Sequence, residues 1–243
     1  EFAFFALILF ILAAKNVDAA VLSKASSNLG LVGYWSFNEG TTTTALDYSG
    51  NKNKGTLVNG PVWVNGKLGK ALDFDGSNDV VLISSTTTNQ TLNDLPAITV
   101  SAWIKPNNVG ENSVGRIAAK ETTNLAGWRF HLQSGPRFVF ARDYTTTDLS
   151  RASSDGSISF GVWQHIVVTW DGSDTASNIK FYKNGDELSY GATTDGVGSK
   201  NNDASESLFI GNRNGLNATF NGLIDEVRVY NRVLSASEVQ KLY

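Results

Sequence analysis

From Gly30 onward, short β-forming runs are separated by Gly, Asn, Asp and Ser at spacings of about 8 to 15 residues. Before Ser235, no segment longer than about ten residues has its apolar residues at helical spacing. Strands joined by such short turns pair in antiparallel sheets, whereas a parallel sheet needs long crossover connections. The pattern therefore predicts an all-β fold, a two-sheet antiparallel sandwich or jelly roll of about thirteen strands.

Two long apolar segments have the composition of central strands. Residues 98–105 (ITVSAWIK) end at Pro106, and residues 162–170 (VWQHIVVTW) end at Asp171 and Gly172. A proline cannot donate to a sheet ladder, so it suits the point where a central strand stops.

Two short signals define the C-terminal third of the chain. Asn184 and Gly185 separate two β-forming runs and give the strongest hairpin signal in the sequence. Ser235 is followed three residues later by Glu238, which is the pattern of a capping box. We therefore expect one short helix at the C-terminus.

The segment 220–231 reads as a strand with an unexpected carboxylate. At a period of two, Asp225 falls in the same row as Leu223, Val227 and Val229. An ionised carboxylate on an apolar face is costly unless hydrogen bonds or a counter-charge satisfy it. We expect backbone N–H groups or a bound cation to satisfy Asp225.

Residues 1–19 differ from the rest of the chain. Residues 2–14 form an apolar run that is shorter than the roughly 20 residues of a membrane-spanning helix but typical of a secretory signal. Small residues at 17–19 suit cleavage near Ala19 or Ala20. We expect a signal peptide or, alternatively, a membrane or assembly helix. A linker over 20–29 and one domain over 30–243 would follow, secreted or displayed at the cell surface. The absence of Met and the start at Glu1 predict a fragment or a trimmed form.

The composition excludes several classes of protein. A net charge of −3 with interspersed charges argues against a polybasic nucleic-acid binder. The chain has no Cys, so disulfides and thiolate chemistry are not available to it.

A series of motifs carries a family resemblance. The motifs are 33–40 (GYWSFNEG), 47–51 (DYSGN), 69–76 (GKALDFDG), 99–106 (TVSAWIKP), 163–172 (WQHIVVTWDG), 182–185 (YKNG) and 222–232 (GLIDEVRVYNR). On these motifs the segment 29–243 resembles laminin G-like (LamG-like) jelly-roll domains of the concanavalin A-like lectin/glucanase superfamily. The resemblance implies a β-sandwich whose first and last strands are neighbours. It also implies an extracellular module for glycan binding, adhesion or protein contact, often with calcium.

That neighbourhood of strands suggests a structural calcium site. Ca²⁺ is bound by six to eight oxygen ligands from carboxylates, amides and backbone carbonyls. Asp47 and Asp225 are the first candidates, with Asn38, Glu39 and Asn51 beside them. The alternative is that Asp47 and Asp225 accept hydrogen bonds from turn N–H groups.

The segment 127–144 supplies a candidate glycan site. Sugars stack on aromatic rings beside polar side chains. The residues of this kind are Trp128, Arg129, Arg142, Asp143 and Tyr144, with Tyr190 as a further candidate. The alternative is that Trp128 belongs to the core and Tyr144 is an isolated surface ring.

Catalytic signals are weak. Glycosidases need two carboxylates that flank one bond, whereas Asp225 and Glu226 are adjacent and therefore point to opposite faces of a strand. Asp73 and Asp75 share a face but lack a third carboxylate. His165 lies in an apolar strand, where a structural role is expected.

The sequence thus predicts a non-catalytic extracellular recognition module. Its partner would be a polysaccharide, a glycoconjugate or a surface protein, and it would touch a membrane only through residues 1–19 if these are not cleaved. An anchored or filament-forming envelope protein with the jelly roll as its head is the alternative, and a glycanase a distant one.

Overall fold

The computed structural model describes residues 28–85, 91–121 and 126–243. The predicted signal or anchor segment 1–19 and residues 20–27 of the predicted linker lie outside these ranges. Within them, no helix is long and apolar enough to span a membrane.

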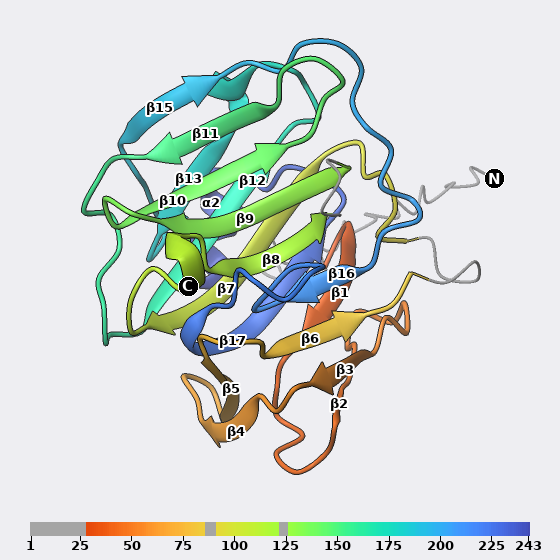
Figure 1. The fold of residues 1–243 in the computed structure, drawn as a ribbon, viewed down its shortest axis with the longest axis vertical. Helices are drawn as coiled ribbons and strands as arrows, with labels where there is room; N and C mark the ends of the chain where they lie inside the picture. Colours follow the sequence, from red (N-terminus) through yellow and green to blue (C-terminus); the bar gives the residue numbers. More distant parts are fainter. Residues whose placement is uncertain (1–27, 86–90, 122–125) are drawn as a thin grey trace, which may run out of the picture.

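The described chain folds into two antiparallel sheets that pack face to face, as predicted (Figure 1). The eight-stranded sheet runs in the order β14 (Asp186–Glu187), β13 (Lys180–Lys183), β12 (Gln164–Trp170), β7 (Ile98–Pro106), β17 (Asn221–Tyr230), β5 (Lys70–Asp75) and β4 (Val62–Asn65). The first strand, β1 (Leu31–Trp35), pairs with the last, β17, as the resemblance implies.

The nine-stranded sheet covers the other side of the core. Its order is β15 (Tyr190–Thr194), β11 (Leu149–Ser153), β10 (Arg137–Arg142), β9 (Gly127–Gln133), β8 (Arg116–Glu121), β16 (Leu208–Ile210), β6 (Val80–Ile83), β3 (Gly55–Val58) and β2 (Thr44–Ala45). This sheet faces the viewer in Figure 1, and β7, β12, β13 and β17 lie behind it. Two short 3₁₀ turns, η1 (Glu111–Ser113) and η2 (Ala176–Asn178), lie in loops.

The main core fills the space between the sheets. Its largest fully buried side chains include Trp35, Trp128, Trp170, Phe130 and Phe140. Burial of an apolar side chain of this size contributes about 1.5–3 kcal/mol relative to exposure, so these rings are a main source of sheet-to-sheet cohesion.

The predicted hairpin and terminal helix are both confirmed. Asn184 and Gly185 have positive φ angles of 54° and 89° between β13 and β14, as a tight hairpin turn requires. The helix α2 (Ala236–Leu242) begins after Ser235, and the capping box with Glu238 is present. The buried Val239 of α2 packs on the outer face of the eight-stranded sheet.

Strand β17 contains a bulge that changes which residues face the core. Against β7, Asp225 pairs with Trp103 and Arg228 with Ser101, so β17 has one extra residue, and Glu226 has a φ of 55°. Ile224, Val227 and Val229 belong to the core between the sheets.

The predicted row of Asp225 with Val227 and Val229 is therefore wrong. Asp225 lies on the outer face of the sheet, opposite Trp103. It is fully buried there, under the turn 66–70.

Candidate functional site

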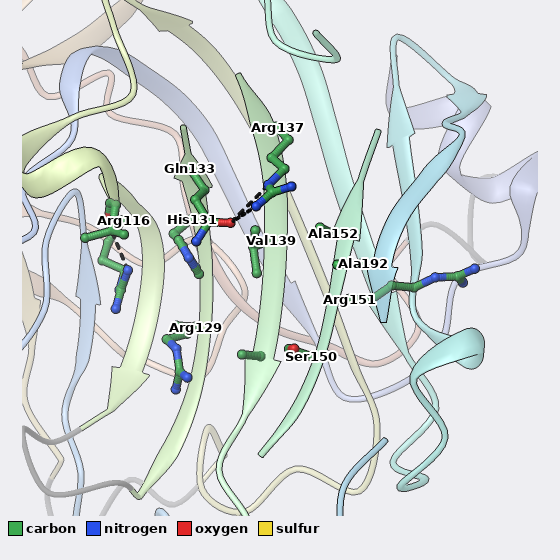
Figure 2. A pocket seen from close by; sticks show the side chains of 12 residues that line it. Arg116, Arg129, His131, Gln133, Arg137, Val139, Ser150, Arg151, Ala152 and Ala192 are labelled. Atoms are coloured by element: carbon green, nitrogen blue, oxygen red, sulfur yellow. Dashed lines mark hydrogen bonds between the residues drawn. The ribbon is translucent and has the colours of Figure 1, made fainter. Parts of the chain in front are cut away.

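A hollow of about 300 Å³ opens on the outer face of the nine-stranded sheet, over β8–β11 and β15. Its size is at the lower end of small-molecule sites, about 300–1,000 Å³. We call it the outer-face hollow. The residues that line it are Val114, Arg116, Arg129, His131, Gln133, Arg137, Val139, Ala141, Ser150, Arg151, Ala152 and Ala192 (Figure 2).

The outer-face hollow arises from strict alternation along β9 and β10. In β9, Trp128, Phe130 and Leu132 are in the core, so Arg129, His131 and Gln133 point outward. Their cross-strand neighbours on β10 are Ala141, Val139 and Arg137. The backbone below the site is therefore fully paired sheet.

Buried carboxylates hold two of the arginines in position. Arg116 Nε lies 2.6 Å from Glu121 Oε1, and Arg129 Nη1 lies 2.5 Å from Asp143 Oδ1 and 3.5 Å from Glu121 Oε2. Glu121 and Asp143 are both almost fully buried. Removal of Glu121 would leave the buried guanidinium of Arg116 without a carboxylate partner, whereas Arg129 would keep Asp143.

Arg137 is held differently, by a neutral side chain. Its Nε and Nη2 donate to Gln133 Oε1 at 3.0 and 2.8 Å, while Nη1 lies 3.2 Å from Asp155 Oδ1. The Asp155 side chain is 68% exposed. Of the three positioned arginines, Arg137 thus has the most accessible counter-ion.

His131 lies between these arginines and is 95% buried, with its Nδ1 lacking a hydrogen-bond partner among the described residues. Burial lowers the pKa of the imidazole well below its ordinary value, and the guanidinium groups of Arg116, Arg129 and Arg213 lower it further. At neutral pH the ring is therefore uncharged and offers one N–H donor and one acceptor nitrogen.

The predicted aromatic platform is corrected at two positions. Trp128 and Tyr144 both belong to the core and present no ring to solvent. Tyr190 is half-buried at the edge of the sheet, where the Arg151 guanidinium lies 3.4 Å from its ring centre. Arg151 accordingly extends away from the other lining side chains in Figure 2.

Arg142 and Asp143 are also buried, but in different networks. Arg142 points to the core side, and its Nη1 lies 2.6 Å from Asp203 Oδ2 in the loop before β16. Lys120 Nζ lies 3.4 Å from the other Asp203 oxygen. Of the six predicted glycan-site residues, only Arg129 lines the outer-face hollow with its charged group, and Asp143 supports it.

Sequence reasoning missed Arg116, His131, Gln133 and Arg137. The sequence signal for them is the alternation along 127–142, in which every second residue points away from the core. The predicted glycan site instead used aromatic and charged residues near the ends of the strands.

The five calcium candidates divide between two loops. Asp225 Oδ2 accepts hydrogen bonds from the N–H groups of Lys67 and Leu68, both at 2.9 Å, and Asn38 accepts from Lys70 N–H of the same turn. Asp225 is therefore bound by backbone amides, which was one of its two expected partners.

Asp47 is engaged at the other loop. It accepts from the N–H groups of Tyr34, Ser49 and Asn53 at 3.0, 2.8 and 2.8 Å. In the same loop Asn51 Nδ2 donates to the carbonyls of β1, while Glu39 accepts from Leu46 N–H.

The described residues contain no group of three or more His, Asp or Glu side chains arranged to hold a metal ion. Backbone and amide oxygens also bind Ca²⁺, so the calcium site stays a prediction.

Comparisons with known proteins agree with the architecture. A family model described as the concanavalin A-like lectin/glucanases superfamily matches residues 75–240. No curated protein sequence matches the chain.

Several solved structures share the fold. The binding domain of Paraclostridial Mosquitocidal Protein 1 has a TM-score of 0.67 and 20% identity, with 89% of this chain and 52% of that chain covered. The binding domain of botulinum neurotoxin serotype D/C has a TM-score of 0.63 and 14% identity, with 89% and 52% covered. This chain thus spans about half the length of both toxin binding domains.

A third similar structure is domain 4 of AbnA, a GH43 extracellular arabinanase from Geobacillus stearothermophilus, in complex with arabinotriose. It has a TM-score of 0.58 and 22% identity, with 87% of this chain and 97% of that domain covered. At these identities the likeness shows the fold alone.

Proposed function

Because the chain belongs to the concanavalin A-like lectin/glucanases superfamily, we propose that it is a non-catalytic carbohydrate-recognition module. The glycan binds in the outer-face hollow. Domain 4 of the arabinanase, whose structure contains arabinotriose, supports a carbohydrate as the partner.

The observation that carries the proposal is the combination of polar and apolar groups on a rigid surface. Arg137, Gln133 and Arg129 offer hydrogen-bonding groups, and Val139 and Ala141 offer an apolar floor between them. A sugar ring presents hydroxyl groups at its edge and C–H groups on its faces, so it needs both kinds of contact. All five residues lie on β9 and β10, so binding orders little backbone.

The described residues around the outer-face hollow do not suit hydrolysis. A glycosidase needs two carboxyl groups about 5–9.5 Å apart that flank the sugar. Here Glu121 and Asp143 are almost fully buried against Arg129, and the more exposed Asp148 and Asp155 are ion-paired with Arg129 and Arg137. This arrangement supports binding without cleavage.

A glycan array with the full chain tests the proposal. We expect the wild type to bind at least one glycan. Ala192→Trp, an exposed position at the edge of the outer-face hollow, should weaken that binding at least about tenfold by filling the space. The matched control is Val62→Trp, at a 59% exposed position on the other sheet.

Two results would contradict the proposal. One is an array without any bound glycan, which would favour a surface-protein partner. The other is equal binding by Ala192→Trp and the wild type. Repeating the array with EGTA tests the calcium prediction, since loss of binding is expected only if calcium orders the site.

Export and anchoring stay predictions, because they depend on residues 1–19. Mass spectrometry of the mature protein tests them. A mature N-terminus near Ala20 would support cleavage and exclude the anchored envelope alternative.

A further inference from the structure

Resting on the proposed function, we infer that the outer-face hollow selects an acidic glycan. Its ligand is a sugar with a carboxylate or sulfate group, bound by Arg137 with Arg129 beside it. A neutral sugar would bind more weakly.

The described lining of the outer-face hollow lacks an aromatic ring, on which neutral sugars depend for stacking. Among the described residues that line the outer-face hollow, none is aromatic, so no ring is available for stacking. None of them is acidic either, whereas three guanidinium groups and one imidazole remain after Arg151, which points away. Recognition must therefore come from hydrogen bonds and charge. Guanidinium groups donate their strongest hydrogen bonds to carboxylate and to oxyanions of similar geometry.

The accessible positive charge of the outer-face hollow comes mainly from Arg137. Arg116 is almost fully buried against Glu121, and Arg129 is paired with Glu121, Asp143 and Asp148. The Arg137 side chain is 27% exposed, and its counter-ion Asp155 is exposed as well.

Arg137 has the geometry of an anion-binding group, and the Asp155 carboxylate lies at the position that a ligand anion would take. Gln133 takes the Nε and Nη2 hydrogens and fixes the plane of the guanidinium. Nη1 is left for Asp155, an exposed side chain on the loop after β11. Exposed ion pairs are weak, so a ligand anion can replace the Asp155 carboxylate at little cost.

His131 adds an uncharged ring beside the charge. The ring is almost fully buried and its Nδ1 is inaccessible to solvent, so this atom supplies no hydrogen bond to a ligand. The neutral hydrogen-bonding group beside Arg137 is the Gln133 amide, so the outer-face hollow offers a charged position for the acidic group and a neutral one for a hydroxyl.

The test compares matched glycans by isothermal titration calorimetry with the full chain. The pairs are 3′-sialyllactose with lactose, trigalacturonate with its methyl ester, and 6-sulfated N-acetyllactosamine with the unsulfated form. We expect at least one acidic member to bind about tenfold or more tightly than its neutral partner. Its affinity should fall as salt rises from about 50 to 500 mM, because ions screen the attraction.

Three variants locate the effect. Arg137→Gln should lower the affinity for the acidic member at least about tenfold and leave the neutral member unchanged. Asp155→Asn should leave the affinity for the acidic member unchanged or raise it, because it removes the competing carboxylate. Lys54→Gln removes the same charge as Arg137→Gln from an exposed loop residue directly before β3, and it should have no effect.

The outcomes separate this inference from the proposed function. If neutral members bind as well as acidic ones and Ala192→Trp weakens both, the acidic preference is overturned and glycan binding in the outer-face hollow stands. If Lys54→Gln acts as strongly as Arg137→Gln, general charge attraction explains the result and the inference fails. Absence of binding by all three acidic glycans contradicts the acidic preference, whereas the proposed function fails only if the glycan array also shows no bound glycan.

Discussion

We expect Asp225→Asn to raise the free energy of unfolding relative to the wild type. The gain should be larger at neutral pH than at acidic pH. Asp225 is fully buried, and its Oδ1 has no hydrogen-bond partner among the described residues. Burial raises the pKa of this carboxyl to about 6; the charge of Glu226 adds to the rise, and the N–H groups of Leu68 and Lys67 oppose it. The carboxylate is therefore ionised at pH 7 in an environment that disfavours its charge.

The size of the effect follows from the pKa. A rise from the ordinary 3.8 to about 6 corresponds to about 3 kcal/mol of lost stability once the group is ionised in both states. Relaxation of the surroundings reduces this, so we expect about 1–3 kcal/mol. Because the folded pKa is the higher one, the contribution of Asp225 is most favourable below about pH 4 and is lost as the pH rises through about 6. Asn cannot ionise, and its Oδ1 can still accept from the two N–H groups.

The assay is urea unfolding of both proteins at several pH values between 4 and 7.5. Only the difference in unfolding free energy is used, since other titrating groups cancel in it. We expect this difference to move by about 1–3 kcal/mol in favour of Asp225→Asn as the pH rises. A difference that stays constant with pH would refute the raised pKa. Stabilisation of the wild type but not of Asp225→Asn by added Ca²⁺ would instead identify a cation as the partner of Asp225.

Two further predictions concern buried features. Asp203→Ala should cost about 3–5 kcal/mol in urea unfolding, because it removes the carboxylate shared by Arg142 and Lys120, both almost fully buried. Gly127→Ala should cost more than about 2 kcal/mol or prevent folding, because Gly127 has a φ of 122° and a Cβ there would lie 1.7 Å from the carbonyl oxygen of Lys120.

Each has a matched control in the same assay. Asp155→Ala removes an exposed partner of Arg137 and should cost less than about 1 kcal/mol. Gly50→Ala tests the backbone strain alone, because Gly50 has a φ of 92° and no atom lies within 4 Å of the added Cβ. It should lower the free energy of unfolding by about 1–2 kcal/mol. Equal costs within either pair would contradict the reasoning.

The architecture was predictable from local signals, because turns and strand composition act over a few residues. The hairpin at Asn184 and the helix after Ser235 are confirmed for this reason. Strand β11 was not predicted because its sequence, LSRAS, has no aromatic or β-branched residue, and its pairing with β10 and β15 makes it a strand.

The candidate site was harder to predict, because it depends on register. One left-handed residue, Glu226, shifts the faces of β17, and no composition rule signals a non-glycine residue with positive φ. Trp128 could be read as a ligand-binding ring or as core, and only the pairing of β9 within the sheet decides that it points inward. His131 and Gln133 then follow as outward residues.

The alternation along β9 gives stability and recognition to different residues of the same strand. Trp128, Phe130 and Leu132 secure the sandwich, and between them Arg129, His131 and Gln133 face the outer-face hollow. An exchange at Gln133 can therefore alter the surface offered to a ligand while the core beneath it keeps its shape. Related domains could acquire different ligand specificities through single exchanges of outward residues, while the core of the sandwich stays the same.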